Sequence, residues 1–320
     1  MPDRDFNILQ IGCGYWGSNL AKTFNSHGYL SHLCDQDYSS ALMLAKEINN
    51  SLSVVPLEGY LSIEGLDAVS IATPAETHFE IAKNCLNNNL HVYIEKPITL
   101  CSKEAQELID LSEKKGLIIQ AGHLLLYHPA LIKMQELIES NKIGDVKYIY
   151  SNRLSAGQIR TFENVAWSFM PHDISMILQL INSEVKNINY HGSNIISKEN
   201  FDSCHLNLTF KSGVKAHIFA SWCNPFKEHK LVVVGQAGSL IFEDSLDEKK
   251  LSLIEMKMDN NTSTGPTIIK TKEVKEISID NDLPLEIACK SFVNCCKEKK
   301  EPIASAKQAM KIVQILERIE

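Results

Sequence analysis

Three glycines lie in one short segment near the amino terminus, Gly12-Cys-Gly-Tyr-Trp-Gly17. An apolar run that predicts a strand precedes this segment, and apolar residues at helical spacing follow it. In this context the first glycine permits a tight turn, Gly14 lets the backbone approach a pyrophosphate, and Gly17 lets the helix pack closely on the strand. Free amides at the helix start attract phosphates. The segment therefore predicts a dinucleotide site, in which we include Tyr15 and Trp16 as binding candidates.

Asp35 ends the second predicted strand, in the position where an acidic side chain accepts hydrogen bonds from the adenosine ribose. A carboxylate there repels a 2′-phosphate, and the next three residues, Gln36, Asp37 and Tyr38, include no arginine. Asp37 also suits an ordinary helix N-cap. We therefore expect NAD rather than NADP as the cofactor.

Glu95, Lys96 and Pro97 follow another apolar run that predicts a strand. Ligands of open α/β sheets bind outside the carboxyl ends of the strands, which is where Lys96 is placed. A lysine whose pKa is lowered by burial or charge, from about 10.4 toward about 7–8, exchanges a proton with an alcohol. The alternative is an exposed lysine that pairs with Glu95.

Together with Ala68-Val-Ser-Ile-Ala-Thr-Pro-Ala-Glu-Thr-His78, the Glu-Lys-Pro segment resembles the Gfo/Idh/MocA family of sugar and cyclitol dehydrogenases. The resemblance covers essentially the whole chain. It implies that Thr73, Pro74 and His78 border the nicotinamide. It also implies that Glu95 and Lys96 reach the reacting end of the cofactor, with Lys96 near the substrate hydroxyl.

A second signature lies in Trp167-Ser-Phe-Met-Pro-His172, which resembles the family's Asp-x-x-x-His motif at the start of a helix. His172 matches, whereas Ser168 stands where the family has an aspartate. Lys96 and His172 are therefore the minimal pair that we expect to move the hydroxyl proton. The alternative for His172 is a helix-start residue paired with Asp173 or with the backbone.

Other residues are candidates for substrate binding. His123 lies in the crossover that follows the last strand of the first half, where the family lines its pocket, while Tyr127 and His128 suit packed connectors equally well. Arg153 and Arg160 precede His172, and arginine forks suit diphosphates. With Trp167 and His172, this stretch is similar to a branch of the family that oxidises UDP-N-acetylhexosamines, including oxidation at C3, in surface-polysaccharide synthesis. Surface ion pairs are the alternative for the arginines.

The elements that must position these residues differ between the two halves of the chain. Residues 1–121 alternate apolar runs and helical patterns, as in a doubly wound Rossmann domain. The predicted strands are Phe6–Ile11, Leu30–Asp35, Ser53–Val55, Ala68–Ala72, His91–Ile94 and Leu117–Ala121. The predicted helices are Trp16–Ser26, Ser39–Asn49, Thr77–Asn87 and Ser102–Lys115.

Residues 122–320 form the predicted second domain, an α/β domain for substrate binding and oligomerisation. After a helix at Pro129–Ser140, alternating patterns predict a largely antiparallel open sheet with strands at Val146–Asn152, His205–Phe210, Val214–Ser221, Lys230–Val234 and Ser239–Glu243. Glycines with positive φ are expected in the turns 211–214 and 236–238. A polar loop is expected at 259–266, and helices at 285–297 and 304–320. Such a sheet favours a homodimer or homotetramer.

Composition narrows the class of partner. The 320 residues carry a net charge of −7, from 39 acidic and 32 basic side chains, which gives no basic field for nucleic acid or a membrane surface. No run approaches the roughly 20 apolar residues of a membrane span, and the acidic first residues do not resemble a signal peptide. We therefore expect a cytoplasmic location. The nine cysteines form no C-x-x-C pairs, so we expect reduced thiols and no metal site.

These observations predict an α/β oxidoreductase that transfers a hydride from a secondary ring carbinol of a sugar to NAD⁺. The expected substrate is a UDP-N-acetylhexosamine oxidised at C3, in the synthesis of surface polysaccharide or lipid A sugars. One alternative is a dehydrogenase of free sugars or inositol, which would need no diphosphate contacts. Another is a catalytically silent NAD-binding regulator, which Ser168 favours and the presence of both Lys96 and His172 opposes.

Overall fold

The computed structural model describes residues 6–161, 163–245, 250–259 and 268–319, and the chain divides into two units. Unit 1 comprises Met1–Tyr127 and Leu283–Glu317, and unit 2 comprises His128–Asp282 and Arg318–Glu320. The two units are described separately below.

The sheet of unit 1 has six strands, all parallel, in the order β3-β2-β1-β4-β5-β6. This doubly wound order confirms the predicted Rossmann fold. Apolar side chains fill the central strands because helices cover both faces of a parallel sheet. The strands are β1 (Ile8–Ile11), β2 (Leu30–Cys34), β3 (Ser53–Val55), β4 (Ala68–Ile71), β5 (His91–Ile94) and β6 (Ile119–Ala121).

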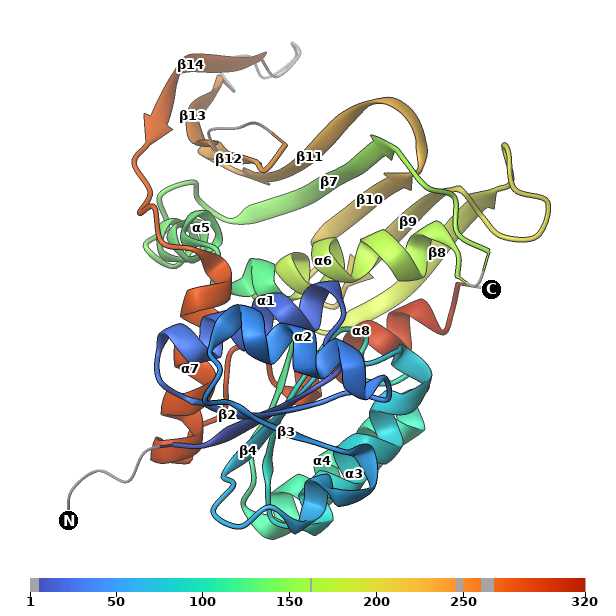
Figure 1. Ribbon diagram of the computed structural model, residues 1–320. Helices are drawn as coiled ribbons and strands as arrows, with labels where there is room; N and C mark the ends of the chain where they lie inside the picture. Colours follow the sequence, from blue (N-terminus) through green and yellow to red (C-terminus); the bar gives the residue numbers. More distant parts are fainter. Residues whose placement is uncertain (1–5, 162, 246–249, 260–267, 320) are drawn as a thin grey trace. The chain divides into compact units, whose positions relative to one another are not determined.

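Helices α1 (Tyr15–Ser26) and α2 (Tyr38–Ile48) cover one face of this sheet, and α3 (His78–Asn87) and α4 (Ser102–Lys115) cover the other (Figure 1). Each of these four helices follows a predicted strand, and its first and last residues lie within one residue of the predicted bounds. Short 3₁₀ segments complete the connections at η1 (Leu57–Ser62), η2 (Ala75–Thr77) and η3 (Leu124–Tyr127).

The last two helices, α7 (Pro284–Glu298) and α8 (Ala306–Leu316), belong to unit 1, although the sequence analysis assigned them to the second domain. The reason is an aromatic cluster in which the fully buried Phe292 packs edge-on against Phe24 and Tyr93, with ring centroids 6.4 and 5.7 Å apart. In addition, Gln120 of β6 donates a hydrogen bond to the Ala288 carbonyl of α7. The chain therefore returns to complete the core of unit 1.

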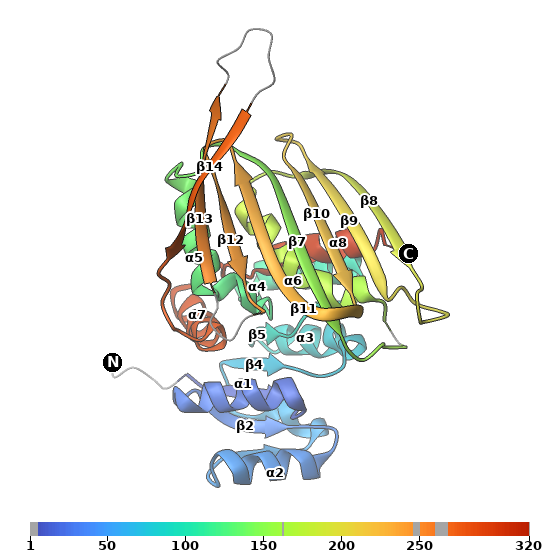
Figure 2. The same cartoon turned by 90° about the horizontal axis from the view of Figure 1, so that it is seen from above.

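Unit 2 contains an open eight-stranded sheet in the order β14-β13-β12-β11-β7-β10-β9-β8, whose strands lie side by side in Figure 2. All its pairs are antiparallel except β7 with β10, which agrees with the prediction. The strands are β7 (Val146–Ala156), β8 (Val185–Ser193), β9 (Ser203–Phe210), β10 (Lys215–Ser221), β11 (Cys223–Gly235), β12 (Gly238–Glu243), β13 (Lys250–Asp259) and β14 (Ile268–Ile277). Helices α5 (Pro129–Glu139) and α6 (Val165–Leu180) cover one face of it (Figure 2).

Both predicted hairpin turns exist, but only the first contains a glycine with positive φ. Gly213 has φ of 89°, as expected for the turn between β9 and β10. Gly238 has no positive φ, which corrects the prediction for the turn between β11 and β12. A side chain would fit tightly there, because a Cβ would lie 3.0 Å from the Ile254 carbonyl oxygen. Strands β8, β13 and β14 were not predicted, and the polar loop expected at 259–266 lies, beyond Asp259, outside the described residues.

Candidate active site

In the glycine turn, residues 12–17, backbone atoms lie too close to Gly12 and Gly17 for either residue to carry a side chain. Gly12 has φ of 87°, and a Cβ on it would lie 2.5 Å from the Ala72 carbonyl oxygen. A Cβ on Gly17 would lie 1.9 Å from the Gly12 oxygen, so helix α1 sits as close to the turn as glycine allows. From the middle of β1, the buried Gln10 Nε2 donates to the Ile11 and Gly12 carbonyls, at 3.0 Å each. The shape of the turn is therefore set by contacts within the protein.

The start of α1 is open to a ligand. Gly14 is its N-cap, and a Cβ there would meet nothing within 4 Å. The cap offers no side-chain acceptor and the first turn has no acidic residue, so the first amides of the helix remain available for an anion. Tyr15 and Trp16 are 78% and 46% exposed, which leaves both rings available to a bound molecule. This arrangement fits the pyrophosphate of a dinucleotide.

Asp35 connects the glycine turn to the end of β2. Its two carboxylate oxygens accept hydrogen bonds from the backbone amides of Cys13, at 2.6 Å, and Asp37, at 2.8 Å. Each oxygen keeps a further lone pair for a ribose hydroxyl. Asp37 is the N-cap of α2 and accepts from the Ser39 amide, which confirms the simpler interpretation of that residue.

His78 joins two loops at the carboxyl edge of the sheet. Its ring nitrogens lie 2.8 Å from the Pro97 carbonyl oxygen and 3.0 Å from the Thr73 carbonyl oxygen, and the residue is 1% exposed. Burial lowers the pKa of its imidazole. His78 therefore holds the Thr73-Pro74 segment against the Lys96–Pro97 peptide bond, which is cis, instead of presenting its ring to a ligand.

Glu95 and Lys96 follow β5 directly, at the same edge as the glycine turn. Lys96 is half-buried, and Glu95 is buried with one carboxylate oxygen accepting from the Lys96 backbone amide at 3.2 Å. Burial raises the pKa of the Glu95 carboxyl to about 7, against the opposing effects of that amide and of the Lys96 charge. The predicted surface pair between Glu95 and an exposed lysine is thus not what the structure contains.

His123 is the second residue after β6, at the same edge of the sheet, and is 2% exposed. Burial, with the Lys96 charge as the smaller cause, lowers its pKa to about 3. It is therefore a neutral, buried ring. Tyr127 and His128 are packed connectors: the Tyr127 hydroxyl accepts from the Ala304 amide, and His128 caps α5 and packs on the Phe242 ring.

In unit 2, helix α6 carries the second predicted group. Asn164 caps the helix by accepting from the Trp167 amide, and Trp167 is partly exposed. His172 is half-buried, whereas Ser168 is 4% exposed. The Asp173 carboxylate accepts hydrogen bonds from Ser151 and Arg153 of β7.

The two arginines predicted for a diphosphate are both in ion pairs. Arg153 is 7% exposed, and its Nε lies 2.7 Å from Asp173 Oδ2 in a fully buried pair. The side chain is occupied because it anchors α6 to the sheet, and this corrects its assignment as a substrate contact. Arg160 pairs with Glu163 at the surface.

Sequence reasoning missed three residues that shape these sites. Gln10 interrupts an otherwise apolar strand, and that interruption is the available signal for its bonds to the glycine turn. Asp173 lies in an apolar stretch of α6, which in the same way signals a buried partner. Gly122 has no local signal, because its need for glycine comes from Glu95 on the neighbouring strand.

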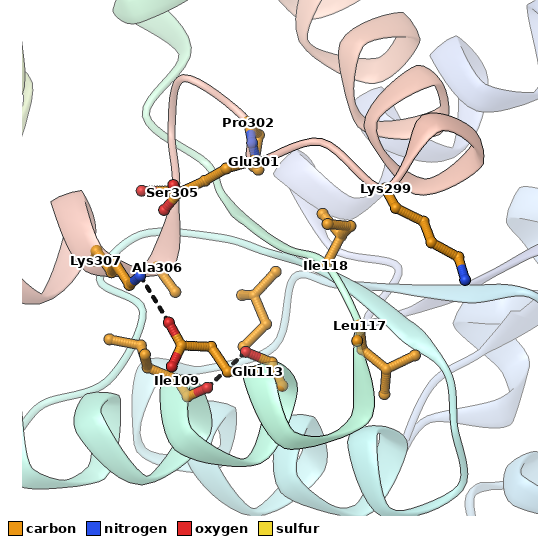
Figure 3. A pocket seen from close by; sticks show the side chains of 13 residues that line it. Ile109, Glu113, Leu117, Ile118, Lys299, Glu301, Pro302, Ser305, Ala306 and Lys307 are labelled. Carbon is orange, nitrogen blue, oxygen red and sulfur yellow. Dashed lines mark hydrogen bonds and ion pairs between the residues drawn. The ribbon is translucent and has the colours of Figure 1, made fainter.

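A separate pocket of about 280 Å³ lies at the opposite end of the unit 1 sheet, where Leu117 and Ile118 precede β6 (Figure 3). Side chains from the end of α4 and from the segment between α7 and α8 line it, and Lys307 is paired with Glu113 at 2.6 Å. It has no link to the glycine turn. Among the described residues there is also no group of ligands for a metal ion, no helix long and apolar enough to cross a membrane, and no disulfide.

Comparisons with known proteins agree with this geometry. Residues 6–123 match the model of the Gfo/Idh/MocA oxidoreductase family with an NAD-binding Rossmann fold, and residues 131–241 match the C-terminal domain of the same family. A UDP-N-acetylglucosamine 3-dehydrogenase of Acidithiobacillus ferrooxidans is 27% identical over 66% of this chain and 65% of its own length. A 2,7-anhydro-N-acetylneuraminate hydratase of Escherichia coli is 25% identical over 73% of this chain and 66% of its own.

The range of relatives includes polyol enzymes. A scyllo-inositol 2-dehydrogenase of Bacillus subtilis is 25% identical over 60% of this chain and 59% of its own length. These alignments span between 59% and 66% of each relative's length. A solved structure of the Acidithiobacillus ferrooxidans enzyme superimposes with a TM-score of 0.85 at 21% identity, over 98% of this chain and 96% of that one, which shows a shared fold. The chain is therefore a member of the Gfo/Idh/MocA family of oxidoreductases, and NAD is its cofactor.

Proposed function

We propose that this chain is an NAD-dependent dehydrogenase that oxidises a secondary ring hydroxyl of a sugar to a ketone. One observation carries the proposal: Lys96 is the second residue after β5, at the edge of the sheet that also holds the open helix start at Gly14. The chain's membership of a family of NAD-binding oxidoreductases supports the proposal. Relatives that are dehydrogenases of sugars and inositols also support it.

In this proposal the residues of the chain bind, orient and move a proton. The glycine turn and the first amides of α1 hold the pyrophosphate, Asp35 holds the adenosine ribose, and Thr73 and Pro74 border the nicotinamide. When bound at these residues, the nicotinamide cofactor would supply the hydride acceptor. Neutral Lys96 accepts the hydroxyl proton, and His172 of unit 2 is the second proton-carrying group.

For the substrate, we propose C3 of a UDP-N-acetylhexosamine, giving a 3-keto nucleotide sugar of the kind used for surface polysaccharide or lipid A sugars. The Acidithiobacillus ferrooxidans relative supports this choice. A free sugar or inositol is the second candidate, because Arg153 and Arg160 are both in ion pairs. An inositol dehydrogenase among the relatives supports that alternative.

The test is a parallel screen of UDP-N-acetylglucosamine, UDP-N-acetylgalactosamine, free N-acetylhexosamines and inositols with NAD⁺, followed by NADH absorbance. We expect turnover with a UDP-sugar and competition by UDP alone. Turnover restricted to free sugars or inositols would replace the substrate. NADH binding without turnover of any of these compounds would contradict the dehydrogenase proposal and favour the regulator.

The matched variants are Lys96→Ala and Lys103→Ala, the latter at an exposed lysine of α4. We expect the first to lower kcat by roughly 10²–10⁴-fold, the range for loss of a general acid–base group, and the second to leave kcat unchanged. Full turnover in Lys96→Ala would remove the mechanism.

We also propose that the open sheet of unit 2 is used for self-association into a homodimer or homotetramer. In the part of unit 2 that the structure describes, no helix covers the second face of the sheet, where Tyr148 is 40% exposed and stacks with Tyr150 on the ring of His217 (Figure 2). Light scattering coupled to size-exclusion chromatography is the test, and a monomer at micromolar concentration would reject it.

A further inference from the structure

Four polar side chains form a row across the buried middle of the unit 1 sheet. Gln10 of β1 is in register with Ser70 of β4, Ser70 with Tyr93 of β5, and Tyr93 with Gln120 of β6. Partners in register on parallel strands point to the same face, and contacts of Tyr93 and Gln120 with α7 identify it as the face that α1 and α7 cover. All four residues have no exposed surface. This polar row therefore runs through what would otherwise be apolar core.

Each residue of the polar row has an atom without a protein partner. Gln10 Oε1, Ser70 Oγ, Tyr93 Oη and Gln120 Oε1 are buried and make no hydrogen bond within the described part of the chain. The amide nitrogens of both glutamines are satisfied by backbone carbonyls. Buried polar atoms in folded proteins are nearly always bonded, and where the protein does not supply the partner, ordered water does. Ordered water between the strands would supply the partners that these four atoms lack.

Glu95 lies at the end of this row nearest the cofactor edge. It is two residues beyond Tyr93 and therefore points to the same face. Its Oε1 atom is buried and has no protein partner among the described residues. Beside it, a Cβ on Gly122 would lie within 2.7–2.8 Å of the carboxyl carbon and both oxygens. The absence of a side chain at residue 122 leaves the space that the carboxyl group occupies.

The groups that face Glu95 come from four elements. Lys96 lies on its own turn, Tyr93 on β5, and Cys289 on α7, while His123 follows β6 and lies within the influence of the Lys96 charge. When protonated, Lys96 is the source of positive charge in this group, because the buried His123 has a pKa of about 3 and stays neutral. Burial raises the pKa of the Glu95 carboxyl to about 7, so its charge changes near neutral pH.

We propose that Glu95 receives the proton that Lys96 takes from the substrate hydroxyl, and that water bound by the polar row shares this proton. The proposal rests on the function proposed above. The carbinol C–H bond breaks and both of its electrons pass as hydride to bound NAD⁺, while the hydroxyl O–H bond breaks as an N–H bond forms on Lys96 Nζ. That N–H bond then breaks as its proton passes through the shared water to Glu95 Oε1, where an O–H bond forms. Release of the proton to water as hydronium restores both side chains.

The first experiment uses the full chain without cofactor or substrate. Glutamate carboxyl carbons are labelled with ¹³C and titrated by NMR, with Glu95→Gln to assign the signal. We expect Glu95 to titrate near pH 7, and a Lys96→Met variant to raise its pKa further because a favourable positive charge is lost. Titration of Glu95 together with the exposed glutamates would overturn the proposal, whatever the enzyme's substrate.

The second experiment compares pH profiles of kcat for Glu95→Gln, Glu95→Asp and the control Glu80→Gln, at an exposed carboxylate of α3. The oxidation rate of the wild type should rise with pH through about 7, as Glu95 becomes able to accept a proton. Glu95→Gln should lose this rise and roughly tenfold or more in kcat with KM unchanged. Glu95→Asp should restore part of it, and Glu80→Gln should match the wild type.

The outcomes separate the relay from the proposed function. Full activity in Lys96→Ala would contradict the proposed function, whereas an inactive Lys96→Ala with an unaltered pH profile in Glu95→Gln would overturn the relay alone. If Glu95→Gln does not fold, Gly122→Ala serves instead, since its methyl group displaces the carboxyl and should also remove the rise near pH 7. A high-resolution crystal structure should place water within hydrogen-bonding distance of Ser70 Oγ and Tyr93 Oη, and a dry row would reject the water site.

Discussion

At the residue scale, the glycines of the glycine turn differ in what a side chain would meet. A Cβ on Gly17 would lie 1.9 Å from a backbone oxygen, whereas one on Gly14 would meet nothing within 4 Å. We expect Gly17→Ala to destabilise the fold by roughly 1–3 kcal/mol, the range for overpacking, and to weaken NADH binding. Gly14→Ala should weaken NADH binding and leave stability within about 0.5 kcal/mol.

Urea unfolding and NADH fluorescence titration measure both effects. Because Gly14 is extended at φ of −69°, alanine adopts its backbone conformation without strain. A Gly14→Ala protein that binds NADH as tightly as the wild type would show that nothing approaches the backbone at this point.

His123 makes stability depend on pH. Its pKa is lowered from 6.5 to about 3, so the unfolded chain binds a proton that the folded chain does not. Above pH 6.5 the ring is neutral in both states, and the folded state keeps its full stability. As the pH falls from 6.5 toward about 3, the unfolding free energy decreases by at most about 1.4 kcal/mol per pH unit. His123→Asn should flatten the dependence of unfolding free energy on pH, with the exposed His191→Asn as the control. Equal slopes in all three proteins would contradict the prediction.

The residues that sequence could identify are those whose role is local. Gly12, Gly17 and Lys96 were found because a turn, a close approach and a strand end are set by their immediate neighbours. Gly122 was not found, since its partner Glu95 becomes adjacent only through the pairing of β5 with β6. Arg153 was misassigned, because its buried partner Asp173 lies on a helix that no local pattern connects to β7.

At the scale of elements, helix α6 is fixed to the unit 2 sheet by a buried polar contact. The Asp173 carboxylate accepts from Ser151 Oγ at 2.6 Å and from Arg153 Nε at 2.7 Å. Asp173→Ala leaves the Arg153 charge buried without its partner, and we expect a loss of about 3–5 kcal/mol. The double variant Arg153→Met with Asp173→Leu should lose less than Asp173→Ala. Chemical denaturation of both variants is the measurement, and a double variant that loses as much stability as Asp173→Ala would mean that the pair is not coupled.

The same scale explains which elements were predicted. Helices and strands of unit 1 were found within a few residues because each has a complete apolar pattern of its own. Strand β8 was missed because most of its side chains are exposed and polar, and its residues acquire strand structure by pairing with β9. Edge strands of this kind are specified by a neighbour and not by their own composition.

At the scale of the whole molecule, the core of unit 1 depends on a distant part of the chain. Phe292 is fully buried against Phe24 and Tyr93. We expect Phe292→Ala to lower the unfolding free energy by about 3–5 kcal/mol. Hydrogen exchange should show the loss of protection in β5 and α1, and the measurement contradicts the packing if protection falls only within α7.

The return of residues 283–317 to unit 1 also governs the order of events during synthesis. As the chain leaves the ribosome, the segment up to Tyr127 emerges long before the helices that seal its aromatic cluster. Domains otherwise fold from the amino terminus as they emerge. Here nearly all of unit 2 is translated while the nucleotide-binding core still exposes apolar surface, so the nascent chain should require chaperone protection until its final helices are released.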